Sequence, residues 1–481
     1  MSLKEKIIRI PYLSDLNNLS KSINVEVYLV GGFLRDIYMK RSGCFDFDFA
    51  VSKKVLELSR RFSKRIKGKL IVLDEGERIY RVILKKTDKI YIYDFSQLKG
   101  ATFKEDVLRR DFSINTLGVK IDDISRPELL DYLGARKDLK KKLIRVVAEE
   151  VLIEDPLRIL RAFSLSARFV LKIGRKTSKL LAKHRKLLGK VSGERINEEL
   201  FKILGSLNSY RLIKKMSDLF ILDEIIPYIS GCRGVSQGGY HHLNVWDHSL
   251  ETLFRFELLY KGNLSKNKVV ADYLNEELSG NRRRIQILKL ACLLHDIGKP
   301  LAKKEKDKRT IFHAHEKIGR DLAQTIALKL KLSSREKEVL KKMIFWHLRP
   351  GYLADEVTPS RRAIYRFFRD TQEEGAGVII LSLADWRATR GPLTDRKRRA
   401  KHEKVMLRLI NKCFQEKEKK PLPKIINGFE IMKKFKLEPS LLIGKVLKKI
   451  KEEQALGNVS NKREAYALAK TMIAKEHRSN A

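Results

Sequence analysis

Residues 27–36 read VYLVGGFLRD, and a second apolar stretch, FDFDFAV, follows at residues 45–51. The first stretch predicts a strand that turns sharply at Gly31 and Gly32, where missing side chains allow close backbone approach to phosphate. In the second stretch Asp46 and Asp48 are two positions apart on a strand, so they project from the same face. Two such carboxylates repel each other unless a cation lies between them. Because oxygen ligands of this kind suit Mg²⁺, we predict a magnesium site at Asp46 and Asp48.

Short β-branched and aromatic runs continue to about residue 119 and include one long helical stretch, VLELSRRFSKRIKG. This pattern predicts a small α/β domain. A third carboxylate is common in such metal sites, and Asp94 in KIYIYDF, on a neighbouring predicted strand, is our candidate. In a two-metal arrangement one ion activates an attacking hydroxyl and the other stabilises departing pyrophosphate.

The bulk composition points to a multidomain protein with a polyanionic partner. A chain of 481 residues predicts two to four domains, and its formal charge of +43 favours nucleic acid. A lysine-rich solvated surface is the alternative. No apolar run is long enough for a membrane span and no signal peptide is evident, so we expect a cytoplasmic protein without membrane contact. The four cysteines are widely spaced and predict buried thiols instead of a disulfide framework.

From about Lys140 the strand signal gives way to helical periodicity. Within this helical part, residues 240–390 carry VWDHSLETL, LLHDIGKP, HAHEKIG, FWHLRP and LADW. A lone histidine in an apolar helix is usually a core residue, but the adjacent pair His295-Asp296 is costly to bury without a cation. Imidazole with carboxylate suits Mn²⁺, Fe²⁺, Ni²⁺, Co²⁺ or Mg²⁺ better than structural zinc. The strongly basic segment 387–404 then leads into a helical tail, as a linker or a phosphate-contacting surface.

Five motifs follow one another in order from the predicted α/β domain into the helical part of the chain. GGFLRD with DFD is followed by RRDFSIN (109–115), DYLGARKDL (131–139), EDPLR (154–158) and ERINEELFKIL (194–204). In this order they resemble the motifs of class II tRNA nucleotidyltransferases and bacterial poly(A) polymerases. The resemblance implies a polymerase-β-like head and nucleotide binding by Gly31, Gly32, Arg35, Asp36, Arg110, Asp111, Asn115, Glu154, Asp155 and Arg158. Thr116, where the family usually has alanine, is a departure beside the sugar-binding Asn115.

The EDPLR motif also allows a chemical argument of its own. Asp155 and Arg158 are three apart at the start of a predicted helix and can share a face. Ionised aspartate only accepts hydrogen bonds and arginine only donates them, which matches the pairing edges of cytosine and adenine and mismatches uracil and guanine. The resemblance assigns the same template role to these residues, with Glu154 supporting Arg158. Without the other motifs, a capping acid and a surface ion pair would be the simpler interpretation.

The histidine motifs resemble the HD superfamily of metal-dependent phosphohydrolases. The resemblance implies His248, His295, Asp296 and Asp385 as metal ligands, with His315 and His347 completing a second metal position and Lys299 contacting a phosphate. It also implies a divalent transition metal or Mg²⁺ as the ion, and 2′,3′-cyclic phosphodiesterase or phosphatase activity, as in some nucleotidyltransferases with such a domain. The tail at residues 426–465 resembles the tail region of long-form members. Its lysines predict phosphate contacts that hold the tRNA elbow, with a solvated helix face as the alternative.

We therefore expect an α+β multidomain protein with a small mixed sheet in the head and helices thereafter. The expected domains are a nucleotidyltransferase head (1–140), a helical neck (141–235), an HD domain (236–395) and a tRNA-binding tail (396–481). The expected function is addition of C and/or A to the 3′ end of tRNA from CTP and ATP. Family members that add only CC lack a flexible loop between DxD and RRD, and this sequence leaves little room for one, so CC and CCA addition both stay open. Poly(A) polymerase, and an HD-type hydrolase whose head only binds RNA, are the alternatives.

Overall fold

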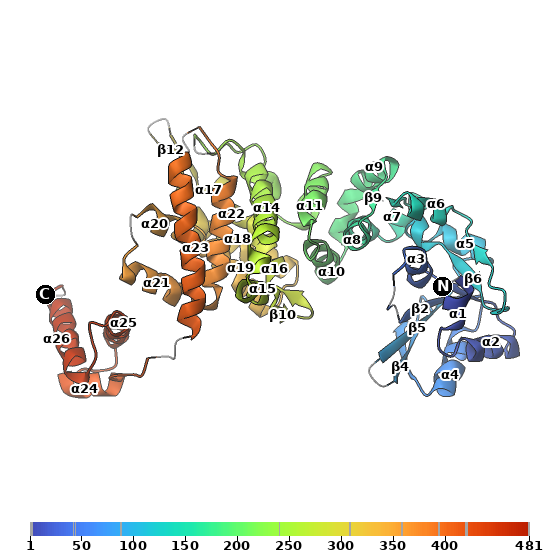
Figure 1. Cartoon of the computed structure of the whole chain (residues 1–481), viewed down its shortest axis with the longest axis horizontal. Coiled ribbons are helices and arrows are strands. Elements are labelled where there is room, and N and C mark those ends of the chain that lie inside the picture. Colours follow the sequence, from blue (N-terminus) through green and yellow to red (C-terminus); the bar gives the residue numbers. More distant parts are fainter. Residues whose placement is uncertain are drawn as a thin grey trace. The chain divides into compact units, whose positions relative to one another are not determined.

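The computed structural model describes residues 3–41, 43, 45–86, 89–239, 241–306, 309–356, 359–392, 395–418 and 422–479. The chain divides into two compact units, Met1–Ile225 and Ile226–Ala481. The fold is α+β with a mixed sheet in the first unit, as the sequence predicted (Figure 1). None of the described helices is both long enough and apolar enough to span a membrane.

The described residues of the first unit form a sheet with the strand order β3-β4-β5-β2-β1-β6-β7. Its strands are β1 (Val27–Val30), β2 (Asp46–Val51), β3 (Lys69–Asp74), β4 (Ile79–Lys86), β5 (Lys89–Gln97), β6 (Gly118–Lys120) and β7 (Leu129–Leu130). Strands β2 and β5 run parallel, and the other neighbours are antiparallel. The central strand of the site therefore has a parallel partner that is distant in sequence.

One face of this sheet is covered by an amphipathic helix. The helices of the head are α1 (Leu3–Ile8), α2 (Leu13–Ser22), α3 (Gly32–Tyr38), α4 (Val55–Ile66), α5 (Phe103–Leu108) and α6 (Ala135–Lys140). Helix α4 packs on β4 and β5, and its Phe62 contacts Tyr93 and Phe95 edge to face. Because side chains alternate along a strand, the covered phenylalanines of β2, Phe47 and Phe49, leave Asp46 and Asp48 on the other face.

The rest of the first unit is almost entirely helical. Its helices are α7 (Glu150–Glu154), α8 (Arg158–Phe169), α9 (Arg175–His184), α10 (Gly193–Leu204), α11 (Ser209–Asp218) and α12 (Ile221–Ile225), with the short strands β8 (Leu143–Ile144) and β9 (Lys172–Ile173) between them. Helices α8 and α10 pack together. This pairing brings the EDPLR and ERINEELFKIL motifs side by side.

In the second unit α22 (Gly375–Ala388), which is apolar apart from Ser382, Asp385 and Arg387, packs against α14 (Val245–Gly262), α16 (Arg284–Leu294) and α23 (Arg396–Glu418). Helices that are apolar on all sides are buried in a core. The other elements here are α13 (Ile229–Cys232), α15 (Lys268–Asn275), α17 (Lys299–Ala302), α18 (His315–Lys329), α19 (Ser334–Trp346), α20 (Arg349–Asp355), α21 (Arg361–Thr371) and the short strands β10 (Glu277–Ser279), β11 (Arg282–Arg283), β12 (Lys303–Lys306) and β13 (Arg309–Phe312). The core of these helices also buries Cys232, Cys292 and Cys413 as free thiols, whereas Cys44 lies outside the described residues.

The chain ends in a small three-helix cluster formed by α24 (Gly428–Phe435), α25 (Leu441–Ala455) and α26 (Lys462–Ser479). It has an apolar core of its own, which includes Ile431, Val446 and Ala469. An ion-pair network attaches α25 to α21, because Glu452 accepts hydrogen bonds from Arg366 at 2.8 and 2.9 Å.

Candidate functional sites

Three aspartates lie together on the open face of the head sheet. Asp46 and Asp48 alternate along β2, and Asp48 is the direct cross-strand neighbour of Asp94 on β5. Arg81, the neighbour of Asp94 on β4, donates two hydrogen bonds to it at 2.7 Å each. The three predicted metal ligands are thus brought together, and Asp94 is held by a guanidinium that sequence reasoning did not identify.

The carboxylates of this cluster are crowded. Burial, followed by the charges of Asp48 and Asp94, raises the pKa of Asp46 to about 6. Burial and the neighbouring Asp94 also raise the pKa of Asp48. Carboxylates that disfavour each other's ionisation in this way form an attractive site for a divalent cation, since the cation removes the repulsion. The residues present therefore fit a divalent metal ion with oxygen ligands.

The glycine turn lies directly against these carboxylates. Gly31 has a φ of +76°, and a Cβ atom added there would lie 2.5 Å from Asp48 Oδ2. The Gly32 N–H faces the same oxygen at 3.4 Å. Any larger residue at position 31 would be strained by its backbone conformation and would push Asp48 away. Gly31 therefore keeps the space beside Asp48 open.

The remaining motif residues of the head form a buried network beside the carboxylates. Arg35 donates hydrogen bonds to Asp36 at 2.9 Å and to Asn115 Oδ1 at 2.7 Å, while its guanidinium lies 4.0 Å from the ring centre of Phe169. Asn115 in turn donates to Asp111 Oδ1 at 2.9 Å. Arg35 and Asp36 thus form a buried ion pair. The hydrogen bond from Arg35 also holds the Asn115 side chain in place.

Arg110 and Asp111 point to different partners. Arg110 is held by an ion pair with Asp106, one helical turn earlier, at 2.7 Å. The Asp111 carboxylate forms an ion pair with Arg161 of α8, with Oδ2 2.8 Å from Nε. About half of the Arg161 side chain is exposed, and the charge of Asp111 raises its pKa against the opposing effect of burial, with smaller contributions from Asp48 and Asp155. Arg161 therefore lies within electrostatic reach of both the carboxylate cluster and the EDPLR motif.

The structure changes the local picture of EDPLR. Asp155 lies in the break between α7 and α8 with an extended backbone, and Arg158 is the first residue of α8. Asp155 pairs with Arg195 of α10 at 3.1 Å and not with Arg158. Arg158 instead donates to the Val151 carbonyl at 3.1 Å and lies 3.9 Å from Glu154. The expectation that Asp155 and Arg158 share a helical face was wrong, because α8 begins only after Asp155.

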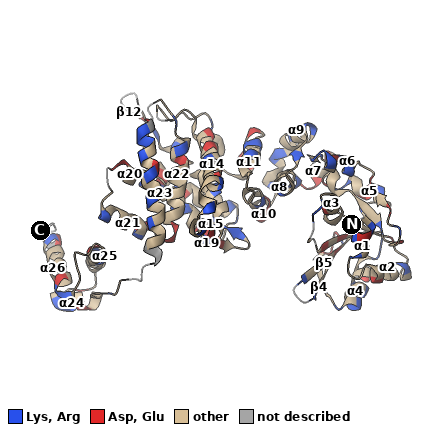
Figure 2. Ribbon diagram, in the orientation of Figure 1, with Lys and Arg blue, Asp and Glu red and all other residues tan. Residues whose placement is uncertain are grey.

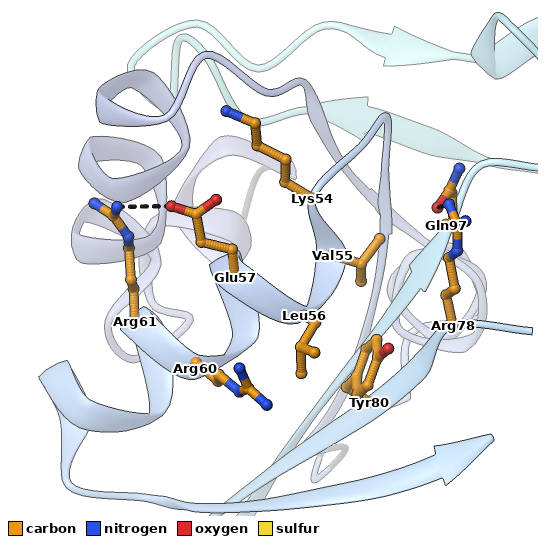
Figure 3. Close-up of a pocket in the computed structure, with 9 residues that line it drawn as sticks. All are labelled: Lys54, Val55, Leu56, Glu57, Arg60, Arg61, Arg78, Tyr80 and Gln97. Carbon is orange, nitrogen blue, oxygen red and sulfur yellow. Dashed lines mark hydrogen bonds and ion pairs between the residues drawn. The ribbon is translucent and has the colours of Figure 1, made fainter. Parts of the chain in front are cut away.

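A separate basic hollow of about 610 Å³ lies on the covered side of the head sheet. Figure 3 shows its lining, in which Arg61 pairs with Glu57 at 2.6 Å and Arg78 donates to Gln97 at 2.6 Å. Tyr80 at its base points to the face opposite its chain neighbour Arg81, which binds Asp94. The hollow is therefore distinct from the carboxylate site.

The second unit holds a buried cluster of histidines and aspartates centred on Asp296. Asp296 Oδ2 lies 3.3 Å from His295 Nε2 and 3.7 Å from His248 Nε2, and Asp296 Oδ1 lies 3.3 Å from His315 Nε2 and 3.7 Å from His347 Nε2. These contacts give two groups of potential metal ligands, His248 with His295 and Asp296, and Asp296 with His315 and His347. Asp385 joins the first group, 2.8 Å from His248 Nε2. All six predicted residues are thus brought together, and Asp296 faces both groups.

Backbone contacts fix the orientation of three of these imidazoles. The Nδ1 atoms of His295, His315 and His347 lie 3.0, 2.9 and 2.6 Å from the carbonyl oxygen three residues earlier. An Nδ1–H donated to a carbonyl leaves Nε2 with a free lone pair, which is the form that binds metal. The three Nε2 atoms are buried and have no hydrogen-bond partner among the described residues. This donor set fits a divalent metal pair.

The charge states in the cluster also suit metal binding. Burial, together with His295 and His315, lowers the pKa of His347 to about 3, so this imidazole is neutral at neutral pH. Burial would raise the pKa of Asp296, but His295 and Lys299 outweigh it and hold that pKa well below its usual range. Lys299 donates to Asp296 Oδ2 and to Gln237 Oε1, both at 2.6 Å. The cluster thus places a neutral His347 beside an ionised Asp296.

Comparisons with known families match the head and the histidine-bearing region to two different families. Residues 27–145 match the family described as the Poly A polymerase head domain, and residues 245–390 match the HD domain. Residues 171–232 match the probable RNA- and SrmB-binding site of polymerase A. Each matched region contains one of the clusters described above, or the helices that follow the head.

Curated relatives match over nearly the whole chain. An A-adding tRNA nucleotidyltransferase of Deinococcus radiodurans is 29% identical over 91% of this chain and 94% of its own length. A CC-adding tRNA nucleotidyltransferase of Thermus thermophilus is 28% identical over 92% of both chains. Among solved structures, a Thermotoga maritima CCA-adding enzyme complexed with tRNA has a TM-score of 0.64 at 20% identity and covers 99% of this chain and 98% of its own. The structural likeness shows that the fold is shared.

The carboxylate head with its glycine turn, joined to a histidine-rich HD domain, defines a nucleotidyltransferase. Its ordered motifs and its relatives place it more narrowly. The chain belongs to the family of class II tRNA nucleotidyltransferases with an HD domain.

Proposed function

We propose that this enzyme adds C, A or both to the 3′ end of tRNA without a nucleic acid template. The observation that carries the proposal is the cluster of Asp46, Asp48 and Asp94 beside the Gly31-Gly32 turn, within electrostatic reach of the EDPLR helix through Arg161. The relatives support the substrate, because they are named for addition of A or CC to tRNA. Structures with the same fold are described as complexes with ATP, CTP and tRNA.

In this proposal Asp46, Asp48 and Asp94 hold Mg²⁺. When bound there, the metal supplies activation of the 3′-hydroxyl and charge neutralisation of the triphosphate. The Gly31-Gly32 turn admits the phosphates close to the backbone, and Arg110 and Arg161 add positive charge near Asp48, lowering its pKa against the effect of burial. Arg81 orients the Asp94 carboxylate through its two hydrogen bonds.

Base choice is proposed to come from Asp155 and Arg158. Asp155 has acceptor capacity beyond its contact with Arg195, since a carboxylate offers about four lone-pair positions. Arg158 is anchored by a backbone carbonyl and by Glu154, so its remaining N–H groups have a defined direction. An acceptor from Asp155 and a donor from Arg158 that both reach one base would match cytosine and adenine, whereas uracil or guanine would leave polar groups unpaired at about 1–3 kcal/mol each.

Single-nucleotide incorporation tests this function. Purified protein is given tRNA ending before the CCA sequence, tRNA ending in C, and tRNA ending in CC, with each labelled NTP in turn. Addition of two C residues defines a CC-adding enzyme, addition of A only to tRNA ending in CC defines an A-adding enzyme, and both together define a CCA-adding enzyme. Long A tracts on any RNA would instead identify a poly(A) polymerase, and absence of C and A addition would refute the proposal.

The histidine cluster supports a second activity, metal-dependent hydrolysis of a phosphoester. His248, His295, Asp296 and Asp385 would hold one divalent metal, and His315 and His347 with Asp296 a second. Metals bound there supply an activated water and polarise the phosphoryl group. Lys299, buried and bonded to Asp296, provides a positive charge beside them. Hydrolysis of a 2′,3′-cyclic phosphate by the native protein, lost in His295→Ala with nucleotide addition retained, would support this activity. Equal hydrolysis by both proteins would exclude it.

A further inference from the structure

The basic segment after the HD match forms one wall of the HD pocket. A cavity of about 340 Å³ is lined by Asp296, Asp385 and Lys299 and by Trp386. Its remaining wall includes Arg398, Arg399 and His402, all from the first turns of α23. The family match ends at residue 390, so this wall lies outside the region that defines the HD domain.

Specific contacts fix the first turns of α23 over the pocket. Helix α23 packs against α20 and α22. His402 is 2% exposed, stacks on Trp386 with ring centres 3.9 Å apart, and lies 3.0 Å from the Gly351 carbonyl through Nε2. At the start of the helix, the Asp395 carboxylate accepts the Arg398 N–H at 2.8 Å. Since residues three apart share a helical face, burial of His402 directs Arg399 to the same cavity.

The cations around this cavity are not equally neutralised. Arg398 pairs with Asp355 at 2.7 Å, and Arg387 pairs with Glu403. Arg399 is half-buried, and none of the described residues offers its guanidinium an acceptor within hydrogen-bond distance. It also crowds Arg390, whose pKa is lowered by burial and then by the charges of Arg255 and Arg399. Lys and Arg colour much of these first turns in Figure 2.

We propose that Arg399 is the phosphate-binding residue of the HD pocket and that this pocket takes the phosphorylated end of a single nucleotide unit. An unpaired, half-buried guanidinium is suited to two parallel hydrogen bonds with a phosphate group. The Trp386–His402 stack offers an aromatic surface for the attached ring. A cavity of about 340 Å³ is at the small end of ligand sites, about 300–1,000 Å³, and excludes a base-paired duplex. The proposal rests on the phosphohydrolase function proposed for the histidine cluster.

Binding of phenylphosphonate, a phosphoester analogue that is not hydrolysed, tests the role of Arg399. Titration calorimetry on the full-length protein in EDTA compares the native protein with Arg399→Ala, Arg399→Lys and Arg408→Ala. Arg408 is an exposed arginine of the same helix and does not line the cavity. Arg408→Ala therefore removes the same charge as Arg399→Ala without changing the cavity. We expect affinity to fall at least about tenfold in Arg399→Ala, as for loss of a charge-assisted hydrogen bond, partly recover in Arg399→Lys and stay unchanged in Arg408→Ala.

Manganese content, measured on the same four proteins, should be equal, which shows that the histidine cluster is intact. Equal phosphonate affinity in native protein and Arg399→Ala, or no phosphonate binding to the native protein, would overturn the proposal. Failure of the phosphohydrolase function has a different signature, because the native protein would then bind no manganese and hydrolyse no phosphoester while phosphonate binding still depended on Arg399.

Discussion

Replacing Asp46 by asparagine should stabilise the metal-free head at neutral and alkaline pH. The pKa of Asp46 is raised to about 6 by burial and by the charges of Asp48 and Asp94. In the unfolded chain the same carboxyl ionises near pH 3.9. Above pH 6 the fold therefore holds an ionised carboxylate in an unfavourable place. As pH falls from 6 to 4 this penalty disappears, because Asp46 becomes protonated in the folded state and then in the unfolded state.

The magnitude follows from the shift of about two pKa units. At 1.36 kcal/mol per unit the full penalty is about 3 kcal/mol, but Asp46 is only partly buried, and screening by solvent leaves about 1 kcal/mol. Asparagine mimics the protonated acid and removes that penalty. For a unit of this size 1 kcal/mol corresponds to about 2–4 °C in Tm. We expect this gain at pH 8 in EDTA and no gain at pH 4.

The two units are distinguishable in one melting experiment. All three tryptophans, Trp246, Trp346 and Trp386, lie in the second unit, so tryptophan fluorescence follows that unit alone. Far-ultraviolet circular dichroism follows both units. The shift from Asp46→Asn should be seen by circular dichroism and not by fluorescence, and added Mg²⁺ should stabilise the native head more than the variant. Equal or lower stability of Asp46→Asn at pH 8 would refute the reasoning.

Three further outcomes test the sites. Asp48→Ala should reduce nucleotide addition by at least about a hundredfold in an incorporation assay while leaving phosphonate binding intact, and retained addition would exclude Asp48 as a metal ligand. Asp155→Ala and Arg158→Ala should admit UTP and GTP, each weakening discrimination by about 1–3 kcal/mol in competition assays; unchanged base choice in both would exclude the template role. His347→Gln should reduce the acid sensitivity of the metal-free second unit, because the pKa of His347 is lowered to about 3 and the native unit loses stability as pH falls from about 6.5 towards 3. Identical fluorescence-detected melting curves at pH 5 and pH 8 would contradict this linkage.

The local part of each site was predictable from sequence, because it depends on strand or helix periodicity. Asp46 and Asp48 share a face for the same reason that Phe47 and Phe49 are buried, which is the alternation of side chains along β2. The position of Asp94 needed more than periodicity. Only the parallel pairing of β2 with β5 places it beside Asp48, and that pairing joins segments that are distant in sequence.

The partners of the predicted residues were not predictable in the same way. Arg81 reaches Asp94 through antiparallel strand pairing, and Arg195 reaches Asp155 through the packing of α10 on α8. Neither contact follows from the spacing within a motif. Arg161 had a usable signal, since it lies three residues after Arg158 on the same helix and so faces the same side. The start of α8 after Asp155 was missed because Pro156 makes the boundary of a helix uncertain by a residue or two.

The histidine cluster shows a local rule that the sequence interpretation did not use. His295, His315 and His347 each direct Nδ1 to the carbonyl three residues earlier, so each backbone segment orients its own imidazole before any metal binds. The role of the basic segment 387–404 could not be decided from composition. Linker and phosphate-contacting surface have the same charge, and only the stacking of His402 on Trp386 places part of this segment over the pocket.

The aspartate cluster of the head and the histidine cluster of the HD domain take up protons at different pH values. Metal binding at the two clusters should therefore depend on pH differently. In the head, burial and the neighbouring carboxylates raise the pKa of Asp46 to about 6, so protons compete with a metal ion near physiological pH. In the HD domain, His295 and Lys299 outweigh burial and hold the pKa of Asp296 well below its usual range, and burial keeps His347 neutral. Acidification from pH 8 to pH 5.5 should therefore weaken metal binding at the head first. Nucleotide addition should decline over this range while manganese stays bound at the histidine cluster. Parallel loss of both would mean that the charges around Asp296 do not protect its site from protons.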